Sequence, residues 1–226
     1  MRALNINHIM GLDNSHLLAL SDGHFLLPEV KTAFEKMQAA AAEAYLDLQI
    51  CSSYRNFERQ LSIWNRKWKG ELPLYTLEGE LLDHSQLSDD EKIHAIMLWS
   101  ALPGASRHHW GSDLDFYDKQ SVERANTKLE LVPSEYENDG PCARLSDFID
   151  LHAADFGFYL PYATYVGGVA REPWHISYKP IAEKIQQEFD IDALRKTLSD
   201  SELLGKEAVL PQLNELVLRY TYNKGV

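Results

Sequence analysis

Two short stretches of this sequence carry the residue types of a metal centre, and they constrain the fold more than any other feature. The first, Ser106–Asp115, contains His108 and Asp115, seven residues apart. The second supplies His175 and, three residues before it, Glu172. Two imidazoles and one carboxylate can occupy three positions of a zinc tetrahedron and leave the fourth open to water, as in catalytic zinc sites. Glu172 would then be the general base that takes a proton from that water.

A short strand is expected to carry one of these ligands. Polar and apolar residues roughly alternate over 112–117, which predicts a strand with Asp113 and Asp115 on one face. Gly111 lets the chain bend just before it. A carboxylate on an interior strand needs a partner, and a cation is the obvious one. Asp113 could orient a metal ligand from behind, pair with Arg55 or face solvent.

Spacing settles only part of the arrangement around the metal. Adjacent residues of an extended chain point to opposite sides, so only one of His108 and His109 should bind the metal, and spacing does not choose between them. Glu172 and His175 would also lie on opposite faces of a continuous strand. We therefore expect a turn at Pro173 to bring both side chains toward the metal.

Three motifs in the right order resemble a known family. Ser-x-His-x-x-Gly-x-x-x-Asp followed by Glu-x-Trp-His is similar to the zinc D-alanyl-D-alanine carboxypeptidases and dipeptidases of the VanY type. A third block, Ser52–Arg55 with the following Gln60, resembles the Ser-Gly-Tyr-Arg segment and Gln of that family. The resemblance covers about residues 25–180. Two residues depart from the pattern: Asp113 stands where the family usually has a small apolar residue, and Ser53 where it usually has Gly.

The resemblance implies a role for each motif residue and Zn²⁺ as the cofactor. It selects His108 over His109 as the ligand, which leaves His109 to line the rim or donate a hydrogen bond. The matching Arg of the family polarises the scissile carbonyl and stabilises the developing oxyanion, so this role falls to Arg55. Gln60 could bind the peptide or the carboxylate of the substrate. Ser106 resembles the Ser near the substrate, although it could equally be a turn residue.

Composition excludes several classes of partner. A chain of 226 residues suits one domain with a sizeable core. Its formal net charge of -12 argues against nucleic acid and against anionic membranes or wall polymers as partners. No run has the length of a transmembrane helix, and the N-terminus lacks a secretory signal, so the sequence alone predicts a cytoplasmic protein. Members of the resembled family usually act outside the cytoplasm. Cys51 and Cys142 could pair.

The remaining pattern predicts a single α+β domain with a mostly antiparallel sheet, flanking helices and the zinc site at one edge of the sheet. The resemblance implies the same fold, that of Hedgehog and D-Ala-D-Ala peptidases. Strands are expected at 47–53, 112–117, 158–166 and 174–178, and helices at 28–45, from 56, at 88–102 and at 146–157. Residues 118–143 are expected to form a long loop, a lid or rim, with one short strand at 129–132. We assign 1–180 to the peptidase-like domain and 181–226 to a helical extension that packs on it or forms a homodimer contact.

The function hypothesis is a zinc metallopeptidase that hydrolyses D-alanyl-D-alanine-type bonds of peptidoglycan stem peptides. Zinc-bound water would be the nucleophile, with Glu172 as base and Arg55 at the carbonyl. The alternatives are a non-catalytic zinc-binding interaction module, a related L,D- or endopeptidase acting on wall fragments, and an enzyme for another amide. An intact Glu172 and Arg55 argue against the interaction module, because a structural zinc site needs neither. The lack of a signal peptide favours a substrate outside the wall.

Overall fold

A four-stranded antiparallel sheet carries the two stretches that the sequence singled out. The computed structural model describes residues 4–225 and orders the strands β3-β4-β6-β5. Their bounds are β3 (Leu48–Ser52), β4 (Asp113–Asp118), β5 (Phe158–Tyr159) and β6 (His175–Tyr178). Across the central pair, Asp115 lies opposite His175, and Asp113 lies opposite Ser177. Residues opposite each other in an antiparallel pair share a face, so all four side chains project from the same side.

The three helices expected before the first metal motif are present. Helix α2 (Pro28–Glu43) has its proline in the first turn, where the missing N–H costs no hydrogen bond. Helix α3 (Phe57–Trp68) is capped by Asn56, whose side chain accepts from the amide of Arg59. Helix α4 (Asp89–Trp99) begins with the expected Ser-x-x-Glu capping box.

Residues 118–143, which were expected to form a long loop, contain regular structure. They include α5 (Lys119–Ala125), which Asp118 caps by accepting from the amide of Ser121, and a 3-10 turn, Pro133–Tyr136. The strand expected at 129–132 is wrong.

Two features of this stretch prevent a strand. The carboxylate of Glu135 accepts from the amides of Glu130 and Val132, so these amides are not available to a neighbouring strand. Leu131 has φ 57°, in the left-handed region that strands exclude.

Other boundaries differ from the expected ones. Helix α6 (Ala143–His152) begins before Ser146, which is therefore not its cap. The strand expected at 158–166 is only β5, since Pro161 has no N–H to donate to a sheet. The first residues, expected to form no element, contain α1 (Ile6–Ile9), β1 (Leu18–Ala19) and β2 (Phe25–Leu26).

The C-terminal helices pack into the core of this chain. They are α7 (Lys179–Glu188), α8 (Ile191–Asp200), α9 (Lys206–Val209), α10 (Leu213–Leu216) and a π-helical turn, Val217–Thr221. Their apolar stripes join the single buried cluster through Ile181, Ile185, Leu194, Leu198, Leu213 and Leu216. Because these stripes are covered within the chain, they give no reason for a second copy, and the expected homodimer contact has no support.

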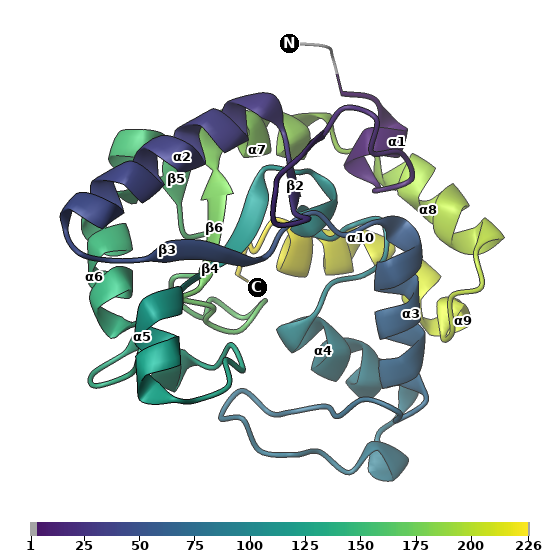
Figure 1. Ribbon diagram of the computed structural model, residues 1–226. Coiled ribbons are helices and arrows are strands. Elements are labelled where there is room, and N and C mark those ends of the chain that lie inside the picture. The colour runs from purple at the N-terminus through teal and green to yellow at the C-terminus, as the bar shows by residue number, and fades with distance from the viewer. Residues whose placement is uncertain (1–3, 226) are drawn as a thin grey trace.

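The helices form two groups around the sheet (Figure 1). Helices α2 and α7 arch over the sheet, with α2 against β3 and α7 against β6. Helices α3 and α4 pack against each other beside it, and α9 packs against α4. The indole of Trp64 on α3 donates to the carbonyl of Leu204, 3.0 Å away, which ties the C-terminal part to this second group. Within residues 4–225, no helix combines the length and apolarity needed to cross a membrane.

Candidate metal centre and active site

His108, Asp115 and His175 converge from three segments. Asp115 and His175 face each other on β4 and β6, and His108 lies on the 3-10 turn Arg107–His109 that precedes β4. One donor atom from each lies within 4.8 Å of the other two. His175 Nδ1 is 3.0 Å from Asp115 Oδ1, and His108 Nε2 is 3.4 Å from Asp115 Oδ2. The sequence-predicted ligands are therefore brought together, whereas His109 is not part of the group.

The geometry of the three residues fits zinc. Donor atoms about 2.0–2.1 Å from a tetrahedral zinc ion lie about 3.3–3.4 Å from one another, close to the spacings observed here. Asp115 Oδ1 and His175 Nδ1 are buried and form no hydrogen bond, although they are close to each other. Two buried polar atoms that face each other without a hydrogen bond need a common partner. Two nitrogens and one carboxylate are the donor set that zinc accepts.

The far nitrogen of each histidine is fixed by a hydrogen bond. His108 Nδ1 lies 2.9 Å from the carbonyl oxygen of Ser53, and His175 Nε2 lies 3.1 Å from Asp113 Oδ1. Each ring therefore donates at one nitrogen and presents the other, His108 Nε2 and His175 Nδ1, to the metal position. Such outer hydrogen bonds set the tautomer and orientation of metal-binding histidines.

Burial and charge shift the pKa values of this cluster in opposite directions. Burial alone would raise the pKa of Asp115, but the charges of the adjacent His108 and His175 hold it well below its usual range. Burial alone would lower the pKa of His175, but Asp113 and Asp115 raise it to about 9. In the metal-free protein, a proton on His175 thus partly compensates the buried carboxylates, where a cation would do so more completely.

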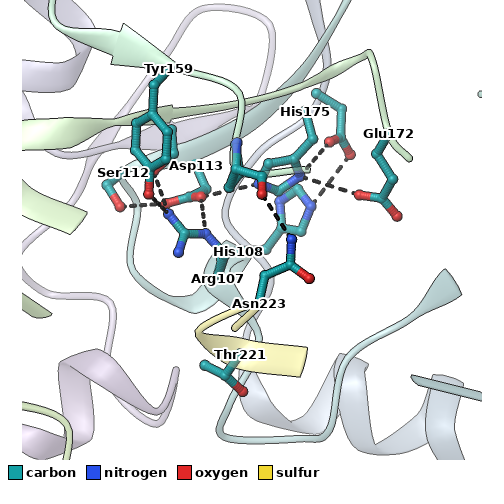
Figure 2. A network of polar contacts seen from close by, with 12 residues as sticks. Arg107, His108, Ser112, Asp113, Tyr159, Glu172, His175, Thr221 and Asn223 are labelled. Carbon is teal, nitrogen blue, oxygen red and sulfur yellow. Dashed lines mark hydrogen bonds and ion pairs between the residues drawn. The ribbon is translucent and has the colours of Figure 1, made fainter. Parts of the chain in front are cut away.

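Asp113, the departure from the family pattern, lies behind His175 in a buried polar network (Figure 2). Its Oδ1 also accepts from Arg107 Nε at 2.7 Å, and its Oδ2 accepts from the Ser112 hydroxyl at 2.6 Å. Nη2 of Arg107 donates to the hydroxyls of Tyr159 and Ser177. The sequence allowed Asp113 to orient a metal ligand, to pair with Arg55 or to face solvent. The structure supports the first of these, because Asp113 Oδ1 holds the ring of His175.

The cation that balances Asp113 is Arg107, and the sequence reasoning did not find it. Arg107 is 3% exposed and its guanidinium lies over the ring of Trp110, 4.6 Å from the centroid. Arg55, the cation considered for this pairing, lies elsewhere. The signal was present in the sequence, because a second carboxylate on a buried strand requires a second cation, and Arg107 directly precedes a metal ligand.

His109 bonds to the backbone around the site and does not face the metal position. Its Nδ1 lies 2.5 Å from the carbonyl oxygen of Arg55, and its Nε2 accepts from the amide of Gly104 at 3.0 Å. The ring is fully buried, and burial lowers its pKa to about 3, so it stays neutral. Of the two expected placements, a hydrogen-bond donor is the one observed, and the donation holds the backbone of Arg55 against the turn that carries His108.

Arg55 reaches the cleft from the junction between β3 and α3. Its amide donates to the carbonyl of His108 at 3.0 Å, and its Nη1 donates to Gln60 Oε1 at 2.7 Å. Gln60 is fully buried, and its Nε2 donates to the carbonyl of Ala101 and the hydroxyl of Ser100. Gln60 thus lies behind Arg55 and outside the cleft lining, where it fixes the guanidinium.

Glu172 faces the metal position without belonging to the three-residue group. The amide of His175 donates to the carbonyl of Glu172, which closes the expected turn through Pro173. Glu172 Oε2 lies 3.8 Å from His175 Nδ1, and its side chain is 14% exposed. Burial raises the pKa of Glu172 to about 7, against the opposing charges of His175 and Arg55. A carboxyl group tuned to neutral pH can both accept and return a proton.

A cleft of about 1000 Å³ opens over these residues. Ser106 lines it beside His108, and the segment 128–134 forms part of its rim, as expected for a lid or rim. Tyr220 and Thr221 of the C-terminal turn also line it, which the sequence reasoning did not foresee. Nearby, Asn223 donates to the carbonyl of Pro161 and accepts from the amide of Val169, and so holds the chain that leads to the Glu172 turn (Figure 2).

The two cysteines, Cys51 and Cys142, are free thiols in the structure. Burial raises the pKa of Cys142 to about 11, and burial likewise raises that of Cys51, so both stay protonated at neutral pH. Neither belongs to the metal group.

Comparison with known proteins identifies relatives of this chain. The sequence model of the VanY family, described as D-alanyl-D-alanine carboxypeptidase, matches residues 23–181, more than two thirds of the chain. One uncharacterized Haemophilus influenzae protein is 36% identical over 121 residues, which are 53% of this chain and 92% of the relative. A second is 43% identical over 95 residues, which are 42% of this chain and 62% of the relative.

Solved structures show the same fold. VanYB in complex with D-alanine-D-alanine is 24% identical, with a TM-score of 0.52 over 76% of this chain and 82% of that one. A variant of the D,D-pentapeptidase VanY from the VanB-type resistance cassette, in complex with Zn(II), is 25% identical, with a TM-score of 0.50 over 76% and 83%. The LdcB LD-carboxypeptidase is 23% identical, with a TM-score of 0.52 over 77% and 73%. The expected α+β peptidase fold is thereby confirmed.

Proposed function

This chain belongs to the VanY family of D-alanyl-D-alanine carboxypeptidases, and we propose that it is a zinc-dependent peptidase that hydrolyses D-alanyl-D-alanine-type bonds in peptidoglycan stem peptides. Its ligands are His108, Asp115 and His175. Glu172 is the general acid–base and Arg55 the group at the carbonyl. The observation that carries the proposal is the position of Glu172, 3.8 Å from His175 Nδ1 yet outside the three-residue group. A site that only held zinc would gain nothing from a carboxyl group with a pKa near 7 at that position.

The metal and the protein divide the reaction between them. When bound, zinc supplies Lewis acidity, which lowers the pKa of a water molecule to about 7 and polarises a carbonyl group. The carboxylate of Glu172 accepts the proton of the attacking water at one oxygen. It then returns this proton to the nitrogen of the leaving amine as the amide bond breaks.

Arg55 stabilises charge on the substrate. Its guanidinium, fixed by Gln60, donates to the carbonyl oxygen on which negative charge develops during attack. Burial lowers the pKa of Arg55 from its usual value, but an arginine remains cationic at neutral pH. A fixed cation in a cleft with little water stabilises such charge more than it would in bulk solvent.

The size of the cleft favours a peptide substrate. Its volume of about 1000 Å³ is at the upper end of the range of about 300–1,000 Å³ usual for small-molecule sites, and more than free D-Ala-D-Ala fills. Ser106 lines the cleft beside His108 and would contact the substrate there. We assign residues 1–180 to the catalytic domain, and we propose that the extension 181–226 serves it by supplying one wall of the cleft.

A release assay tests the proposed function. Zinc-loaded protein would be offered free D-Ala-D-Ala, a pentapeptide stem ending in D-Ala-D-Ala, and a tetrapeptide stem, and the freed D-alanine would be measured. We expect release from the pentapeptide. Release from the dipeptide alone would make the protein a dipeptidase, release from the tetrapeptide alone would make it an L,D-peptidase, and release from none would remove the proposal.

A further inference from the structure

Lys67 lies in the cleft and has no role in the chemistry described so far. It is in the last turn of α3, two helical turns after Gln60 and therefore on the same side of the helix. Arg55, Glu172 and Lys67 all line the same cleft. The end of a helix is a favourable place for a cation, but the helix does not explain why this one faces the cleft.

No anion of the described chain satisfies Lys67. Within residues 4–225, no carboxylate oxygen lies within 4.0 Å of its ammonium nitrogen. Two other cations near the site already have a role, since Arg107 is bonded to Asp113 and Arg55 is held by Gln60 beside the reacting carbonyl. Burial lowers the pKa of Lys67 to about 8, with the charge of Glu172 opposing the shift, so the ammonium form still predominates at neutral pH. A half-buried cation without a partner binds an anion readily, because part of its desolvation cost is already met.

The chemistry of the proposed substrate identifies this anion. Glu172 returns its proton to the nitrogen of the leaving residue, and the carboxylate of a terminal residue is attached to the carbon next to that nitrogen. This carboxylate must therefore lie close to Glu172, on the far side of the scissile bond from the acyl group. Lys67 lines the same cleft as Glu172, and the two side chains are near enough for their charges to act on each other. Arg55, the other cation that acts on Glu172, is already assigned to the carbonyl oxygen.

We propose that Lys67 binds the C-terminal carboxylate of the peptide substrate and thereby selects a free chain end. The inference rests on the proposed function and adds to it a residue that distinguishes a carboxypeptidase from an endopeptidase. A substrate whose terminal carboxylate is blocked would leave the ammonium of Lys67 without its partner.

The test compares a peptide ending in D-Ala-D-Ala with the same peptide ending in a carboxamide. The zinc-loaded wild type should favour the free acid in kcat/KM by about 10–100-fold, the usual worth of a hydrogen bond between charged groups. Lys67→Met, which keeps the length of the side chain and removes the charge, should bring this ratio close to 1. Lys67→Arg should keep most of it.

Lys128 supplies a matched control. It also lines the cleft but is exposed on its rim, so Lys128→Met removes one positive charge from the same cleft and should leave the ratio unchanged. If Lys67 only tuned Glu172, Lys67→Met would alter the hydrolysis of acid and amide equally and keep their ratio. That result, with zinc content and melting temperature unchanged, overturns the inference. Should Lys67→Met fail to fold, Lys67→Gln replaces it in the same comparison.

The outcome separates this inference from the proposed function. A wild type that cleaves neither peptide contradicts the peptidase itself. In that case calorimetry still tests whether Lys67 binds the carboxylate. It measures the affinities of the zinc-loaded wild type and of Lys67→Met for the two peptides. Equal dissociation constants of the wild type for acid and amide would contradict this binding role.

Discussion

Asp113 lies 3.1 Å from Nε2 of His175, on the side of the ring opposite to the metal position. A carboxylate that accepts from a metal-binding imidazole raises the basicity of the other ring nitrogen and holds the ring in place. The family pattern usually has a small apolar residue here, so this chain adds a negative charge to the interior. Arg107, 2.7 Å from the same carboxylate, balances it.

Asp113→Asn should weaken zinc binding by about 10–100-fold, the usual effect of removing such an outer partner. The amide can still accept a hydrogen bond, but the negative charge behind the ring is gone. Competition with a chelator gives the dissociation constant. Asp118→Asn is the control, because Asp118 is also buried on β4, caps α5 and has no contact with the ligands. Equal affinity in both variants would show that Asp113 contributes only to folding.

Removing a ligand should empty the site. His108→Ala and His175→Ala should each lose most of the zinc, because two ligands hold the ion far less well than three. Elemental analysis of protein purified without added metal provides the measurement, and we expect one zinc per wild-type chain. His152→Ala, which removes an exposed imidazole, should keep its zinc. Full zinc retention in both ligand variants would rule out the proposed centre.

Zinc affinity should fall with decreasing pH. His175 has a pKa of about 9 in the metal-free protein, so at neutral pH it carries a proton that zinc must displace from Nδ1. Because this pKa is raised, the proton is held at every pH below about 9, and each unit of acidification should cost up to about tenfold in affinity. Calorimetry in buffers of different ionisation enthalpy measures the released protons. An affinity independent of pH between 6 and 8, with no proton released, would contradict this account.

Arg55→Lys should lower kcat by about 10²–10³ with zinc content unchanged. An ammonium group is a point charge on a flexible stem, whereas the guanidinium can donate to Gln60 and to the substrate oxygen at once. Arg59→Lys makes the same exchange at an exposed position in the first turn of α3 and should retain full turnover. Near-normal kcat in Arg55→Lys would show that this residue does not stabilise the oxyanion.

The three residues that converge at the site could be predicted because each motif is local in sequence and the family resemblance chose His108 over His109. Alternation over 112–117 placed Asp113 and Asp115 on one face, and β4 has that arrangement. The turn at Pro173 followed from the incompatibility of a three-residue spacing with a common strand face. The helix starts at Pro28, Asn56 and Ser88 could also be predicted, since an N-terminal proline and N-cap residues are local signals.

What the sequence did not reveal depends on contacts between distant segments. The full environment of Arg107 could not be predicted, because its Nη2 donates to Tyr159 on β5 and Ser177 on β6, which only the fold brings near. The C-terminal residue Asn223 reaches Pro161 and Val169 by hydrogen bonds that no periodicity encodes. The domain boundary at residue 180 stays a prediction, because one buried cluster spans both sides of it.

Loop structure was the weakest part of the prediction. The stretch 129–132 has strand composition, but the carboxylate of Glu135 accepts from the amides of Glu130 and Val132. Such a side chain competes with a sheet for the same donors, and composition alone does not show which partner wins.

The most direct test of the account is Glu172→Gln. The amide keeps the size of the side chain but cannot take a proton from water, and general acid–base groups contribute about 10²–10⁴-fold. Glu172 would serve both proton transfers, so D-alanine release from a pentapeptide stem should fall by an amount in the upper part of that range. Zinc content and melting temperature should stay as in the wild type, because Glu172 is not one of the three ligands.

One measurement therefore decides: the rate of D-alanine release per bound zinc in Glu172→Gln and wild type, prepared side by side. We expect an equal zinc content and a rate lower by about 10³–10⁴-fold. Loss of zinc from the variant would make Glu172 a ligand and contradict the assignment of the site. Equal rates per bound zinc would contradict its role as the base.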